Sequence, residues 1–132
     1  MAGTKASLTR SQRYARAAAA CLTDRSSGRS PKEYRSRAVS FPALIHAAGL
    51  CQALAFAASK EEFRDYLDDL ARVLESDREA LLRTSREADT FAYLRLGRDA
   101  MEAAGWLKRY AEALLPAEDS SRSEVTRDDG HA

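Results

Sequence analysis

The chain carries almost no signal for β-strands, and its longest regular pattern has the period of an α-helix. Valine and isoleucine are few, and apolar and polar residues do not alternate over any sustained stretch. Near the C-terminal end, seven apolar residues recur at spacings of 4, 4, 3, 4, 4 and 3. They are Ala92, Leu96, Ala100, Ala103, Leu107, Ala111 and Leu114. We therefore expect an all-α fold whose last helix covers about residues 85–115 and ends at Pro116.

Four earlier stretches have helical composition, and a fifth, short one has a weaker signal. A chain of 132 residues is long enough for one domain and too short for two ordinary ones. We expect a compact single-domain bundle of about five to six helices over residues 1–115, packed around a buried central helix. Residues 116–132 are polar and acidic, which predicts a disordered tail. The earlier helices are expected over about residues 7–23, 31–40 and 42–59, from Ser59 through Leu74, and over 78–84.

Three residues set the expected boundaries around the third of these helices, which is the central one because it is apolar nearly all round. The residue before Pro42 is pushed out of the helical region, so the second helix should end there. Gly49 is expected inside the third helix, where it costs about 1 kcal/mol relative to alanine and a close helix–helix approach would compensate. Ser59 is expected to cap the fourth helix, with Glu62 completing a capping box.

The net charge of +1 conceals an uneven distribution. Residues 1–37 hold nine Lys or Arg and two acids, so their charge is +7. Residues 61–77 hold seven acids and two arginines, so their charge is −5, and the tail from Pro116 has a charge of −3. The basic N-terminal part is therefore the expected contact for a polyanion.

The two cysteines, Cys21 and Cys51, are far apart and lack a CxxC pattern, so we expect two buried thiols. The first residues contain no apolar signal segment, and the apolar stretch 44–58 is too short to span a bilayer. We expect a cytoplasmic protein with no membrane partner.

Residues able to support catalysis or metal binding are scarce, and we expect no enzyme, no cofactor and no metal site. His46 lies on the most apolar helix, where a packed or interface role is expected, and His131 lies in the tail. Neither zinc-ligand spacing nor a phosphate-binding glycine loop is present. The carboxylates Asp65, Asp68 and Asp69 share a helix face, which is interpreted as solvated and as a possible docking surface for a basic partner.

The basic side chains are the strongest candidates for a binding role. On charge alone they fit contact with nucleic acid and an ordinary solvated helix surface equally well. Tyr34 lies among them and offers a planar side chain for stacking or hydrogen bonding. The candidate RNA-binding residues are Arg13, Arg16, Lys32, Arg35 and Arg37, followed by Lys108 and Arg109, which belong to a second basic set with Arg95 and Arg98.

Several separated motifs resemble one known family, the small subunit (the fifth subunit) of the type III-B CRISPR effector complex, called Cmr. The resemblance covers about residues 8–115, in order and with similar spacing, and the long tail after Pro116 departs from it. The motifs are Thr9-Arg10-Ser11-Gln12, Glu33-Tyr34-Arg35-Ser36, Phe41-Pro42-Ala43-Leu44-Ile45, Ala48-Gly49-Leu50, Gln52-Ala53-Leu54-Ala55-Phe56, Tyr93-Leu94-Arg95 and the closing stretch 104–114.

The resemblance implies an all-helical subunit with no catalytic activity of its own. Copies of such a subunit stack in the minor filament of the complex, next to the large subunit and the repeated backbone subunit. They line the channel in which guide RNA and target RNA pair, and they hold the target strand by its backbone. Two other hypotheses stay open: a structural spacer that contacts only proteins, and a small ribonuclease, which lacks a general-base constellation.

Overall fold

The computed structural model describes residues 7–117, and all regular structure in that range is helical. The all-α prediction is therefore confirmed. The predicted disordered tail lies outside the described residues from position 118 onward. The division of the chain into residues 1–115 and 116–132 therefore stays a prediction. The elements are α2 (Arg10–Ser26), α3 (Pro31–Ala48), α4 (Leu50–Ala58), the short 3₁₀ helix η1 (Glu61–Phe63), α5 (Arg64–Val73), α6 (Arg78–Glu87) and α7 (Thr90–Leu114).

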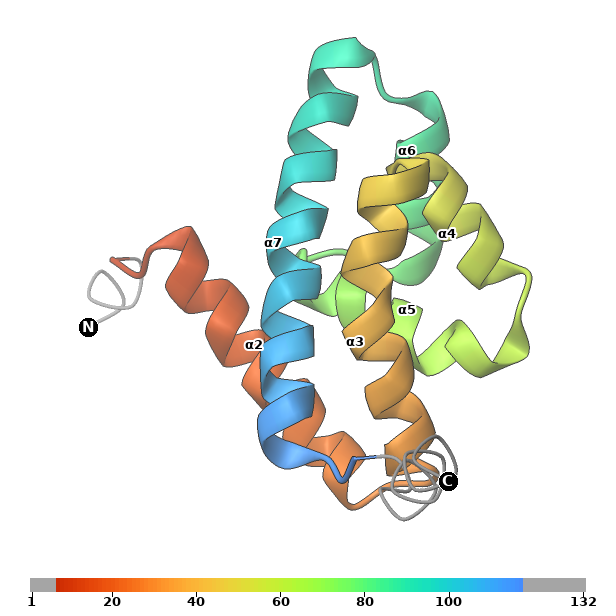
Figure 1. Cartoon of the computed structure of the whole chain (residues 1–132). Helices are drawn as coiled ribbons and strands as arrows, with labels where there is room; N and C mark the ends of the chain where they lie inside the picture. The colour runs from red at the N-terminus through yellow and green to blue at the C-terminus, as the bar shows by residue number, and fades with distance from the viewer. Residues whose placement is uncertain (1–6, 118–132) are drawn as a thin grey trace, which may run out of the picture.

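The long helix α7 is the common wall of the bundle (Figure 1). Helix α3 runs antiparallel beside it, and α2 crosses it obliquely, so both pack extensively on α7. The short helices α4, α5 and α6 cover the remaining side. The middle of the apolar stripe that predicted α7 is buried, since Ala100, Ala103, Leu107 and Ala111 are inaccessible to solvent, whereas its two ends at Ala92 and Leu114 are exposed.

Pro42 does not end a helix, so the expected boundary before it is wrong. Helix α3 continues through Pro42 to Ala48. An internal proline removes one backbone hydrogen bond and costs about 3 kcal/mol. The neighbouring Phe41 and Ile45 are buried, and each contributes about 1.5–3 kcal/mol by leaving water. The free energy gained by burying one continuous face of α3 therefore outweighs the tendency of proline to end a helix.

Gly49 separates two helices, so the expected continuous helix over 42–59 is also wrong. Its φ of 85° lies in the region that favours glycine, and it both ends α3 and begins α4. The turn is tied to α7, because the amide of Cys51 donates a hydrogen bond to the hydroxyl of Tyr93 at 3.0 Å. Gly49 serves a sharp change of direction and not a close approach of two helices.

The helix ends that follow also differ from those expected. Ser59 lies at the end of α4 and its hydroxyl donates to the carbonyl of Phe56, so it does not cap the next helix. The segment from residue 78 is a full helix rather than a single turn, because Asp77 caps α6 and α6 extends to Glu87. Helix α7 starts later than expected, at residue 90, where Asp89 caps it.

An ion pair shielded from water joins α2, α3 and α5. The guanidinium of Arg25 donates two hydrogen bonds to the carboxylate of Asp69, at 2.8 and 3.1 Å. The hydroxyl of Tyr34 donates to the same carboxylate at 2.5 Å. Asp69 is only 5 % exposed, so its assignment to an outward, solvated face is wrong. A carboxylate at this depth requires both partners.

Replacing Asp69 by alanine should lower the free energy of unfolding by about 3 kcal/mol, because it leaves Arg25 and the Tyr34 hydroxyl without their acceptor. Asp68→Ala is the matched control. Asp68 is half exposed, and among the described residues it pairs only with Arg78, at 3.0 Å, so its loss should cost about 0–1 kcal/mol. Guanidinium titrations of both variants measure the difference, and equal losses would contradict the structural role of Asp69.

The protein should lose stability at alkaline pH through two buried tyrosines. Burial, followed by the negative charge of Asp69, raises the pKa of Tyr34 and of Tyr66 above the usual tyrosine value. Because the pKa of each tyrosine is higher in the folded protein than in the unfolded chain, its full contribution to the free energy of unfolding is present below the unfolded-state pKa. This contribution is lost as the pH rises from the unfolded-state pKa through the folded-state pKa. Above about pH 10, the free energy of unfolding should fall by about 1.4 kcal/mol per pH unit for each tyrosine.

Urea titrations across the alkaline range measure this slope. Tyr66→Phe is an informative control, because the Tyr66 hydroxyl is buried with no hydrogen-bond partner among the described residues. This variant should keep its stability at neutral pH and lose the contribution of one tyrosine, about 1.4 kcal/mol per pH unit, from the alkaline slope. An unchanged slope would show that Tyr66 does not titrate with unfolding.

Candidate nucleic-acid interface

The two candidate residues on α2 differ in their surroundings. Arg13 forms an ion pair with Glu75 at 3.0 Å and also donates to the carbonyl of Leu8. Much of its charge is therefore already compensated within the protein. Arg16 is exposed and has no ion pair among the described residues. Of the two, Arg16 has the side chain that is available to a phosphate.

On α3, Arg37 lines a hollow of about 400 Å³ between the end of α2, the start of α3 and the start of α5. Three further arginines line it, namely Arg25, Arg29 and Arg64, and none of them was among the candidates. The charge of this hollow is mixed, because Glu61, Glu62 and Asp65 also line it. Three of these arginines lie within residues 25–37, and the fold brings Arg64 of α5 to them.

Arg35 and Lys32 complete the candidates on α3. Lys32 is exposed in the first turn of the helix. Arg35 is half-buried, and its Nε is buried without a hydrogen-bond partner among the described residues. A buried donor of this kind favours an acceptor from a binding partner, because leaving it unpaired costs about 1–3 kcal/mol.

Lys108 and Arg109 lie on α7, where they line a second hollow, of about 440 Å³, together with Pro42 and Gly105. Neither forms an ion pair among the described residues. The candidates are thus divided among three helices: Arg13 and Arg16 on α2, Lys32, Arg35 and Arg37 on α3, and Lys108 and Arg109 on α7.

Tyr34 is not available for stacking on a nucleic acid. Its side chain is buried, and its hydroxyl is committed to Asp69. The guanidinium of Arg25 lies over its ring, 5.4 Å from the centroid. The expectation of an exposed planar side chain here is therefore wrong, and the hydrogen bond that Tyr34 donates is internal.

The residues considered for other chemistry do not converge in the described part of the chain. His46 is exposed in the last turn of α3, so it is not a packed core residue. Cys21 is buried, as expected, and burial raises its pKa to about 12, which keeps it a thiol; Cys51 is only half-buried. Over residues 7–117, no three acidic, histidine or cysteine side chains form a group suited to a metal ion. None of the helices in this range is both long and apolar enough to cross a membrane.

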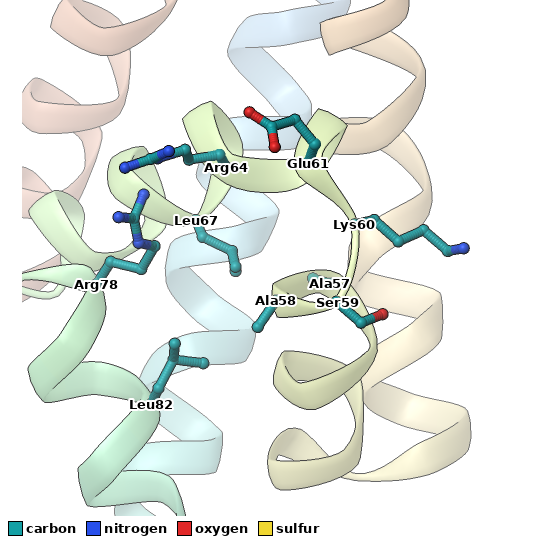
Figure 2. A pocket seen from close by; sticks show the side chains of 9 residues that line it. All are labelled: Ala57, Ala58, Ser59, Lys60, Glu61, Arg64, Leu67, Arg78 and Leu82. Carbon is teal, nitrogen blue, oxygen red and sulfur yellow. The ribbon is translucent and has the colours of Figure 1, made fainter.

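A further hollow, of about 290 Å³, lies between α4, α5 and α6 (Figure 2). Leu67, Leu82 and Ala58 point into it, whereas Arg64 and Arg78 lie at its rim. Arg78 is held there by its ion pair with Asp68. The hollow contains none of the seven candidate residues and no acid–base pair of the kind that catalysis uses.

These features define a small all-helical protein whose polar surface is suited to contact with charged partners. The family model described as "CRISPR-associated protein (Cas_Cmr5)" matches residues 10–114. The chain belongs to this family, and the resemblance seen in the sequence is confirmed.

Two similarities to a bacterial relative agree with this assignment. The chain is 43 % identical over 110 residues to the "CRISPR system Cmr subunit Cmr5" of Thermus thermophilus, covering 81 % of this chain and 96 % of that protein. It is also similar to the X-ray crystal structure of a CRISPR-associated Cmr5 family protein from the same organism, with a TM-score of 0.80 and 41 % identity. That match covers 83 % of this chain and all of the solved one.

Proposed function

We propose that this protein is a non-catalytic subunit of a type III-B CRISPR effector complex, which stacks in the minor filament and binds the backbone of the target RNA beside its duplex with the guide. Membership of the Cmr5 family over residues 10–114 is the observation that carries the proposal. The relative from Thermus thermophilus is itself named a Cmr subunit.

The surface chemistry supports a backbone-binding role. Guide pairing reads the sequence of the target, so a subunit beside the duplex needs cations for phosphates and no base-reading motif. Arg16, Lys32 and Arg37 offer such cations without an ion pair among the described residues, and the buried Nε of Arg35 favours an external acceptor. The proposed RNA-binding set is Arg13, Arg16, Lys32, Arg35, Arg37, Lys108 and Arg109.

The proposed partners follow from the same role. They are the large subunit and the repeated backbone subunit of the Cmr complex, further copies of this chain, and the guide and target RNAs. Head-to-tail stacking of copies is a heterologous contact, which generates open filaments. The proposed location is the cytoplasm.

The variant Arg35→Ala/Arg37→Ala should weaken capture of target RNA by the assembled complex, because it removes two cations from α3. The slope of log affinity against log salt should fall by about 0.7 for each lost phosphate contact to a single strand. The measurement is a salt titration of target binding with complexes that contain wild-type or variant subunit.

The matched control is Arg83→Ala/Arg86→Ala on α6, which removes the same charge from an exposed helix on another side of the bundle. It should leave the salt slope unchanged. Equal slopes for the α3 variant and the wild type, with both folded, would reject Arg35 and Arg37 as RNA contacts.

A purely structural spacer is the second candidate function, and the exposed apolar side chains at the start of α7 favour it. Phe91 is 83 % exposed and Leu94 is 56 % exposed, which suits a protein contact. In a spacer, the α3 charge variant would reduce incorporation into the complex before it affects RNA. Size-exclusion chromatography of the variant with its partner subunits separates the two functions.

Purified protein should not cleave labelled RNA in the presence of divalent metal, because no three acidic, histidine or cysteine side chains among the described residues form a group suited to a metal ion. Gel analysis of the RNA over time measures this. Steady cleavage that survives repeated purification would contradict the non-catalytic role.

A further inference from the structure

The outward face of α7 is hollowed at Gly105. Two hollows meet there, of about 470 Å³ and about 440 Å³, and they share Gly105 and Arg109. A Cβ built at Gly105 meets no atom within 4 Å, so the glycine is not required by packing. Glycine in a helix interior lowers stability relative to alanine. The missing side chain leaves the backbone of α7 accessible at the centre of this hollow.

The two sides of this hollow differ in chemistry. On the α2 side it is walled by Trp106, whose ring is half-buried and stacks with Tyr110, with centroids 6.0 Å apart and planes inclined by 22°. On the α3 side it is walled by Met101, Lys108 and Pro42. The aromatic ring of Trp106 therefore lies on one side of the hollow and the ammonium group of Lys108 on the other, with the exposed backbone at Gly105 between them.

The two carboxylates that line the hollow differ in their surroundings. Glu102 lines the hollow, but its carboxylate accepts hydrogen bonds from Ser11 at 2.7 Å and from Arg10 at 3.1 Å. The hydrogen bond from Ser11 lowers the pKa of Glu102, and the hydrogen bond and positive charge of Arg10 lower it further. Glu112 also lines the hollow and forms no ion pair among the described residues. Lys108 and Arg109 offset these two carboxylates in charge, and neither cation forms an ion pair among the described residues.

We propose that the hollow over Gly105 is a single-stranded RNA subsite, in which one unpaired base lies on the backbone of α7 against Trp106 while Lys108 and Arg109 hold the adjoining phosphates. Sequence-tolerant binding of single strands combines aromatic stacking with cations that follow the backbone, and both are present here. The subsite rests on the proposed function, because it assigns part of the target-RNA contact to α7.

The test uses the full-length chain and a short oligouridine. Trp106 is the only tryptophan, so its fluorescence reports occupation of the hollow directly. Titration to millimolar oligouridine at low salt should quench it. Gly105→Ala should weaken binding about threefold and Gly105→Gln about tenfold, because each fills the floor on which the base lies.

The melting temperatures of the same variants give a second measurement, which separates a binding role of Gly105 from a structural one. Both replace a helix-interior glycine by a better helix former, so the melting temperature should rise by about 2–6 °C while affinity falls. Gly97→Ala is the matched control: Gly97 also lies on α7 with open space around its Cβ, but it does not line the hollow. It should raise the melting temperature and leave quenching unchanged.

Absence of quenching throughout the titration, or equal affinity of Gly105→Gln and wild type, would overturn the subsite. Target capture by the assembled complex separates this failure from failure of the proposed function. If the complex needs the subunit for capture but tolerates Gly105→Gln, only the subsite is wrong. If capture is the same without the subunit, the proposed function fails as well. If Gly105→Gln prevents incorporation and wild-type quenching is absent, the hollow holds a protein side chain.

Discussion

Arg25 and Asp69 form an ion pair on which the arrangement of α2, α3 and α5 depends. A carboxylate this far from water costs several kcal/mol unless charged and hydrogen-bonding partners surround it. Arg25 and Tyr34 supply those partners from α2 and α3, so α5 packs correctly only when both other helices are in place. The pair thereby also fixes the spacing of the arginine-lined hollow, because Arg25 belongs to its wall.

The helix α7 packs against both α2 and α3, and cations of those two helices meet where α2 ends and α3 begins, in the hollow lined by Arg25 and Arg37. Arg10 reaches across from α2 to Asp99 and Glu102, at 3.6 and 3.1 Å, and its single charge offsets one of these two carboxylates. The outward side of α7 carries Lys108 and Arg109, so this helix offers cations to a partner on one side and packs against the core on the other.

Local periodicity was sufficient to predict the helical class and the buried face of α7, because a long stripe of regular spacing has one structural interpretation. It failed where tertiary packing overrides local preference. Pro42 remains in a helix because its neighbours are buried, and Gly49 breaks one because the chain must turn toward Tyr93. Asp69 looked like its solvated neighbours because a helix-face argument does not include a partner 44 residues earlier in the chain.

The limits on predicting the site have the same origin. Composition locates cations along the chain, but it does not reveal which of them are already neutralised. Arg13 and Arg16 lie one turn apart on α2, yet within residues 7–117 only Arg13 meets a carboxylate. Likewise the hollow at Gly105 is lined by residues 101–112 of α7 and by Pro42 of α3, and only the fold brings Pro42 beside that stretch. In a nearly neutral protein, the charges available to a partner are those that form no ion pair within the protein. These charges can be identified only when the three-dimensional structure is known.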